Sequence, residues 1–269
     1  MTSSRQFADP WPAPGVPWAD PPWIMSGTSL TAWFETPAAA VAALLSPAFE
    51  PLTEAAGVPT RLRFYEVGYQ PRDGGTEFRR RMAGRFREAV IAFKGRIAGH
   101  GGEYSAYMWT DCEPYLCWGR ENFGWPLVGG DIELTGHLWG GPAGAGTHCQ
   151  LRANGFSYAL DLDGPAAEDM PGSGAGPSWL TPRRILFPGG SEPERRDVLL
   201  IRPAVLEAGR LTRRAGRVRL DAPAGSWIAS LAPLGEVDIH ALEGFRICVG
   251  DDVGTVREAG AAQDGRPSQ

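Results

Sequence analysis

The chain has 269 residues, of which 43% are hydrophobic and 21% are charged, a balance that suits one large globular domain or two small ones. Its formal net charge of −5 argues against a nucleic-acid surface, and no apolar run approaches the roughly 20 residues of a membrane span. The four cysteines lack C-x-x-C spacing and are not grouped with histidines at metal-ligand spacing. We therefore expect reduced thiols, no metal or other cofactor, and a cytoplasmic protein.

The N-terminal part of the chain predicts an arm, a strand and a helix. Residues 1–22 are rich in Pro, Ser and Ala and lack the basic and apolar stretches of a signal peptide, so we expect an irregular arm. Residues 30–34 read as a strand. A helix should follow, because Thr36 is a good N-cap residue and Pro37 suits the first helical position. We expect this helix to end at Pro47.

Most of the remaining chain consists of short apolar or alternating segments between Gly-rich turns, a pattern typical of strands. These segments cover residues 61–70, 86–97, 104–110, 115–118, 132–139, 151–162, 185–188, 198–202, 205–220 and 239–249. Residues 164–176 are expected to form a loop, and residues 258–269 a disordered tail. Many short strands and few helices predict a barrel or bent sheet in a single domain, residues 23–257.

One segment carries a recognisable motif. Residues 112–126 read CEPYLCWGRENFGWP, which is E-P-x-x-x-x-G-R-E-x-x-x-W-P. This pattern resembles the acetoacetate decarboxylase family, and residues 62–64 and 86–104 resemble that family's V-R-F and Y-x-E…G-D-Y segments. The resemblance extends loosely over residues 24–250. It implies an α+β fold, with an antiparallel cone-like β-barrel, a few flanking helices, a buried pocket and a homo-oligomeric assembly.

The resemblance also shows where this chain departs from the family. There, the motif's proline is followed by two lysines; the first forms a Schiff base, and the second lowers the pKa of the first. Leu127 and Val128 occupy those positions here, and the one lysine of the chain is Lys94. The family's arginine of the first strand falls near Ser26 or Gly27, where no cation is present. Standard Schiff-base chemistry is therefore not expected.

Three residues are the candidate catalytic groups. One family glutamate falls on Glu88, and the other falls on Tyr65, with Glu66 next to it. A pocket-facing Glu88 without a cation would have a raised pKa and could act as a general acid or base, whereas on the surface it would simply pair with Arg85 or Arg87. Tyr65 could donate to a developing enolate oxygen, or it could be an aromatic filler of a half-buried strand.

Five residues are the expected pocket walls. They are Trp125, Leu127, Val128, Trp33 and Tyr107. Because two ammonium groups are replaced by aliphatic side chains, we expect an apolar pocket with one carboxylate. Such a pocket would reject acetoacetate for want of a counter-ion and would suit a larger, neutral substrate that is still a small apolar organic molecule. Neither a nucleic acid nor a membrane is an expected partner.

These observations leave three hypotheses. The first is an enzyme of specialised metabolism that uses acid/base chemistry for cyclisation, dehydration or isomerisation of a keto or polyene substrate. The second is a non-catalytic protein that binds an apolar small molecule. The third is a lysine-dependent decarboxylase or aldolase that uses Lys94, six residues or about 20 Å along the strand from Glu88 and on the same face.

Overall fold

A computed structural model describes residues 22–45, 49–54, 57–72, 84–120, 124–135, 146–170, 179–186 and 193–257. The expected tail at 258–269 and residues 1–21 of the expected arm lie outside these ranges. The described chain is mostly strand, which confirms the predicted fold class.

Seven of the described strands close into a barrel. In spatial order they are β1 (Trp23–Thr36), β3 (Val58–Pro71), β4 (Gly84–Ile97), β5 (His100–Thr110), β10 (Trp179–Leu186), β11 (Pro193–Glu207) and β13 (Leu234–Arg257). β13 pairs with β1 and completes the ring. Neighbouring strands are antiparallel except β5 and β10, which run parallel. Two short strands extend the wall: β2 (Phe49–Pro51) pairs with β4, and β6 (Leu127–Gly129) pairs with β5.

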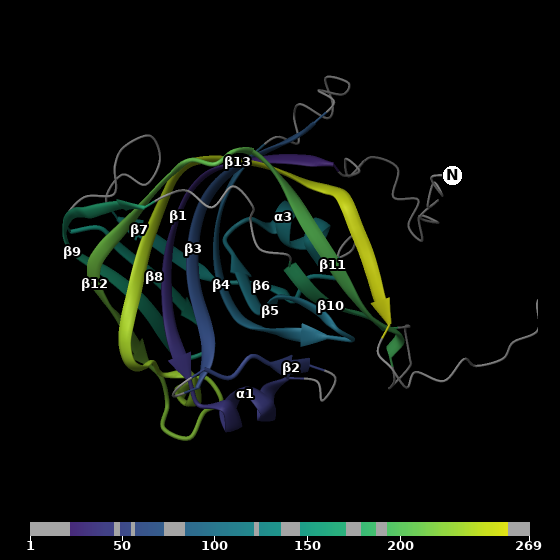
Figure 1. Ribbon diagram of the computed structural model, residues 1–269, viewed down its shortest axis with the longest axis horizontal. Helices are drawn as coiled ribbons and strands as arrows, with labels where there is room; N and C mark the ends of the chain where they lie inside the picture. The colour runs from purple at the N-terminus through teal and green to yellow at the C-terminus, as the bar shows by residue number, and fades with distance from the viewer. Residues whose placement is uncertain are drawn as a thin grey trace, which may run out of the picture.

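Four further strands form a second layer beside the barrel. They are β12 (Arg210–Asp221), β9 (Phe156–Met170), β8 (His148–Ala153) and β7 (Asp131–Thr135), joined to the barrel through β13. In Figure 1 these strands lie on the left, the barrel strands β4, β5, β10 and β11 lie on the right, and β1 and β3 run between the two groups. The first strands of the barrel therefore have one face toward the barrel interior and one toward the second layer.

A glycine marks the place where the two layers separate. Residues 239–243 of β13 pair with β12, whereas residues 246–257 pair with β11. Gly244, with a φ of 68°, lies between them as an extra residue opposite the Gly27–Thr28 step of β1. A glycine at positive φ in a β-bulge bends a strand sharply. The bulge thus lets one strand serve both sheets.

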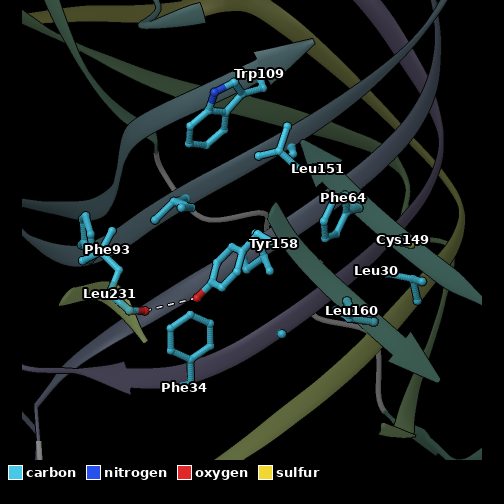
Figure 2. Packing of buried hydrophobic residues seen from close by; sticks show 14 of the residues in the cluster. Leu30, Phe34, Phe64, Phe93, Trp109, Cys149, Leu151, Tyr158, Leu160 and Leu231 are labelled. Atoms are coloured by element: carbon cyan, nitrogen blue, oxygen red, sulfur yellow. Dashed lines mark hydrogen bonds between the residues drawn. The ribbon is translucent and has the colours of Figure 1, made fainter. Parts of the chain in front are cut away.

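The strand alternation separates two apolar clusters. The outer core, between the barrel and the second layer, includes the side chains shown in Figure 2: Leu30, Phe34, Phe64, Phe93, Trp109, Cys149, Leu151, Tyr158, Leu160 and Leu231. Within it the Tyr158 hydroxyl donates a hydrogen bond to the Leu231 carbonyl at 3.2 Å. The inner cluster lies inside the barrel and includes Trp23, Met25, Val67, Phe86, Val90, Met108, Tyr115, Trp125, Leu127, Ile201 and Phe245.

The helices correct two sequence predictions. Helix α1 (Ala38–Leu44) begins after Pro37, and its first turn has no side-chain cap. Thr36 does not act as the N-cap because it still belongs to β1, where it pairs with Val58. Residues 115–118, predicted as a strand, belong to helix α3 (Glu113–Trp118). A proline in the first turn and an acidic residue beside it are helix-start signals that outweigh the apolar composition. A short 3₁₀ turn, η2 (Ala229–Leu231), completes the described helices.

The second layer corrects two more predictions. Residues 151–162, expected as one strand, are divided between β8 and β9 by a turn at Asn154 and Gly155, with φ values of 49° and 82°. An Asn-Gly pair with both φ values positive is the signature of a two-residue hairpin. Residues 164–170, expected as a loop, continue β9 because its partner β12 is long enough to pair with them.

Candidate active site in the barrel

The barrel interior holds a small, partly open cavity near helix α3. Its volume is about 40 Å³, room for roughly three waters or a molecule of a few heavy atoms. Most of its wall is apolar and comes from the inner cluster. The polar side chains that line it are Arg61, Tyr65, Glu88 and Ser105. Phe86 and Tyr115 line the cavity at the start of β4, so α3 covers this end of the barrel.

Glu88 is part of this cavity wall. It sits on β4, directly opposite Tyr65 on β3, and its side chain is buried, with the residue only 5% exposed. Burial raises the pKa of Glu88 from 4.5 to about 8, although a hydrogen bond from Tyr115 and the charges of Arg61 and Arg63 act in the opposite direction. Glu88 is therefore mostly protonated at neutral pH. The surface pairing with Arg85 or Arg87 does not occur.

Tyr115 is a cavity residue that the sequence analysis missed. Its hydroxyl donates to Glu88 Oε1 at 3.4 Å, and its ring stacks on Phe86 with 3.7 Å between centroids. Burial raises the pKa of Tyr115 well above the usual value for a phenol. The apolar composition of residues 115–118 predicts a strand, which gives no reason to expect Tyr115 beside Glu88. As part of α3, Tyr115 instead projects from the cap of the barrel onto Glu88.

Arg61 corrects the expectation of a cavity without a cation. Its side chain lines the cavity, is 2% exposed, and forms a buried ion pair with Glu103 of β5. Burial, together with the charge of Arg63, lowers the pKa of Arg61 to about 9, so it stays charged at neutral pH. The signal was present in the sequence: Arg61, Arg63 and Tyr65 alternate along one strand and so share a face.

Arg63 holds the Tyr65 phenol. Arg63 Nη1 donates to the Tyr65 hydroxyl oxygen at 2.6 Å, and Arg63 Nε donates to Thr31 Oγ1 at 2.8 Å. Since the phenol oxygen accepts from Arg63, its own hydrogen remains available to donate elsewhere. Tyr65 also lines the cavity, and it is thus a directed hydrogen-bond donor beside Glu88.

Glu66 points away from this site. Successive side chains of a strand face opposite sides, and both neighbours of Glu66, Tyr65 and Val67, line the cavity. On the other face Glu66 approaches Arg87, with 3.9 Å between Oε1 and Nε. The structure therefore brings Glu88 and Tyr65 together, but not Glu66.

The expected pocket walls are only partly assembled. Trp125 lines the cavity. Leu127 is fully buried in the inner cluster with Trp125, although it is not one of the residues that line the cavity. Val128 is 41% exposed and lies outside the cavity, because the strand alternation of β6 turns it away from buried Leu127.

The remaining candidates lie elsewhere. Trp33 and Lys94 line a second, more open pocket of about 860 Å³ near the start of β13, where Lys94 Nζ lies 4.4 Å from the centre of the Trp33 ring. Tyr107 stacks on Trp227 at 4.2 Å, on the side of β5 that faces the second layer. A bulge between Ser105 and Tyr107 keeps these two residues on opposite faces of β5.

The described ranges contain no group of three or more His, Cys, Asp or Glu side chains placed to hold a metal ion. None of their helices is long and apolar enough to cross a membrane.

Comparisons with known proteins agree with this architecture. The MppR enzyme of enduracididine biosynthesis, in a complex with pyruvate, superposes with a TM-score of 0.69 at 18% identity, covering 90% of this chain and 93% of MppR. The acetoacetate decarboxylase of Legionella pneumophila gives 0.68 at 15% identity, covering 92% and 93%. An acetoacetate decarboxylase-like enzyme from Sphingomonas wittichii gives 0.64 at 18%, covering 90% and 95%. No curated protein sequence gives a significant match.

The sequence itself decides the family. The profile of the acetoacetate decarboxylase family matches residues 8–234, which is most of the chain. The match contains the G-R-E…W-P motif and the strands that carry Arg61, Tyr65 and Glu88. By sequence profile and by fold, the chain belongs to the acetoacetate decarboxylase family.

Proposed function

We propose that this protein is an enzyme of specialised metabolism that performs acid/base chemistry, without a covalent intermediate, on a small oxo acid. The observation that carries the proposal is the pairing of Glu88 with Tyr65 in one buried cavity. The first step is removal of a proton from the carbon next to the substrate carbonyl. Isomerisation, dehydration and cyclisation of oxo compounds can all proceed from the resulting enolate.

Each of the two groups has a defined role in this step. The Glu88 carboxylate takes the proton, and its pKa of about 8 makes it a stronger base than an ordinary glutamate. The protonated form can then return the proton to carbon or to a leaving group. The Tyr65 hydroxyl, oriented by Arg63, donates to the enolate oxygen as negative charge develops there.

Several observations favour this chemistry over a Schiff base. Leu127 is an aliphatic side chain at the position that the resemblance assigns to the reactive lysine. Lys94 lies over the Trp33 ring in the other pocket, and it is not among the residues that line the Glu88 cavity. The structure also bears on the substrate class. The small cavity and the buried Arg61 guanidinium favour a small oxo acid over a polyene. MppR, which has a similar fold, forms a complex with pyruvate.

The test is hydrogen–deuterium exchange of the pyruvate methyl group, because this exchange reports enolisation without the natural substrate. The wild-type protein in D₂O is expected to accelerate loss of the methyl proton NMR signal. Glu88→Gln should lower this rate by roughly 100-fold or more, the usual effect of removing a general base. Glu66→Gln is the matched control: it removes a carboxylate from the opposite face of β3 and should leave the rate unchanged.

Two results would contradict the proposal. Equal exchange by wild type and Glu88→Gln would remove Glu88 from the mechanism, and binding of pyruvate without any exchange would favour a binding protein. Borohydride reduction followed by mass spectrometry adds an independent readout. A reduced pyruvate adduct on Lys94 would establish the amine chemistry instead.

A further inference from the structure

Two buried hydrogen-bond donors in the cavity wall have no partner among the described residues. They are Nε of Arg61 and Nε1 of Trp179, and both side chains line the cavity. Leaving a buried donor unsatisfied costs about 1–3 kcal/mol, so such groups are rare in proteins and call for an explanation. Two of them in the wall of one small cavity indicate a hydrogen-bond acceptor that the protein itself does not supply.

The strand register places the two donors at the same level of the barrel. Arg61 is opposite Ala92 on β4, and Ala92 is opposite Ser105 on β5. The small Ala92 side chain leaves room for Arg61 to reach across β4 to Glu103. Trp179 on β10 pairs in turn with Glu103. The guanidinium and the indole therefore approach the same part of β5 from two sides.

The charges facing the barrel interior favour an anion at this place. Arg61 and Arg63 supply two positive charges, and Glu103 supplies one negative charge. Glu88 is mostly neutral at pH 7 because its pKa is about 8. Lys94 is also opposite Glu103 on this face, although it lines the other pocket. Positive charge therefore exceeds negative charge here, which favours an anionic ligand such as a carboxylate.

We propose that Arg61 Nε and Trp179 Nε1 form a carboxylate-binding subsite, so that the substrate is a monoanionic 2-oxo or 3-oxo acid. This inference deepens the proposed function and rests on it for the reaction, but binding at the subsite can be tested alone. The subsite lies on β3 and β10, not at Ser26 and Gly27 of β1, where the family resemblance would put an arginine. It holds the substrate's carboxylate while the carbonyl lies toward Tyr65 and Glu88.

The experiment compares the binding of pyruvate with that of its neutral methyl ester by calorimetry or ligand-observed NMR. The wild-type protein should bind pyruvate more tightly than methyl pyruvate. Trp179→Phe removes one N–H donor and should weaken pyruvate binding roughly tenfold while affecting the ester little. Trp109→Phe is the matched control: Trp109 Nε1 is also buried without a partner, but it belongs to the outer core, so pyruvate binding should not change.

A second variant tests the arginine without leaving a buried charge unpaired. Arg61→Gln alone would leave Glu103 as a buried carboxylate without its ion-pair partner. The double variant Arg61→Gln with Glu103→Gln is therefore compared with wild type, after circular dichroism has shown that it folds. It should lose the preference for pyruvate over the ester. The subsite is wrong if wild type does not bind pyruvate, binds both molecules equally, or binds pyruvate unchanged in Trp179→Phe. If Glu88→Gln exchanges the pyruvate protons as fast as wild type does, while the binding differences above are observed, only the proposed reaction is rejected and the subsite stands.

Discussion

The two faces of strand β4 show how the same wall serves two regions of different chemistry. Ala89, Ile91 and Phe93 point into the outer core, which is almost entirely apolar. Glu88 and Lys94 alternate with them on the inner face. The outer face can be packed for stability alone, whereas the inner face keeps ionisable groups, of which Glu88 is buried, that weaken packing and make acid/base chemistry available. Predictions that separate stability from chemistry can therefore test this division.

The largest expected effect is on the stability of the outer core. Leu151 is fully buried on β8, and Leu151→Ala leaves a cavity in a closely packed layer. The free energy of unfolding should fall by about 2–5 kcal/mol, measured by urea denaturation. Because Leu151 is in the outer core, the exchange rate per folded molecule should match wild type. A folded Leu151→Ala protein that has lost exchange activity would show that the two regions are not separate in function.

The next effect comes from the inner face and depends on pH. Glu88 has a raised pKa in the folded chain, so between pH 4.5 and about 8 the folded state keeps a proton that the unfolded chain has lost. The stability from this group is complete below pH 4.5 and is lost as pH rises through about 8, with a slope of up to about 1.4 kcal/mol per pH unit. Unfolding free energies of wild type minus those of Glu88→Gln, at pH 5, 6, 7 and 8, should show this slope. A constant difference would mean that Glu88 is ionised in the folded protein.

The smallest effect concerns the hydrogen bond that links Tyr158 to Leu231 in the outer core. Tyr158→Phe removes the hydrogen bond to the Leu231 carbonyl and keeps the ring, including its edge-on contact with Phe34. Stability should fall by about 1 kcal/mol, with no change in the pH slope. Chemical denaturation at two pH values measures both. A changed slope would indicate that the outer core and the Glu88 cavity are coupled.

The sequence was sufficient for the fold because the strand pattern and the G-R-E…W-P motif are local signals. It also identified Glu88 and Tyr65, since both positions could be carried over from the family segments one by one. Arg61 was missed although its spacing from Tyr65 puts both side chains on one face of the strand. Trp179 was missed for a different reason: its position depends on the pairing of β10 with β5, which cannot be read from the spacing within one segment.

Two residues that the sequence analysis wrongly assigned to the pocket show the same limit of sequence-based prediction. Val128 was assigned to the pocket because it occupies the position of the family's second lysine, and Tyr107 was assigned because of its aromatic type. A shift of one residue in a strand reverses the side a residue faces, so nearness in sequence carries little information about the cavity. The β8–β9 hairpin, in contrast, could have been predicted from the sequence, because Asn154-Gly155 is a typical two-residue turn.

The bulge at Gly244 has a consequence for how this protein can diverge. Strands β7, β8 and β9 belong only to the second layer, and β10 and β11 belong only to the barrel, so each set can accept substitutions without reference to the other. β13 belongs to both, and every change in it must suit two neighbours at once. We therefore expect β13, which also contributes Phe245 and Ile247 to the cavity wall, to change slowly in relatives of this protein.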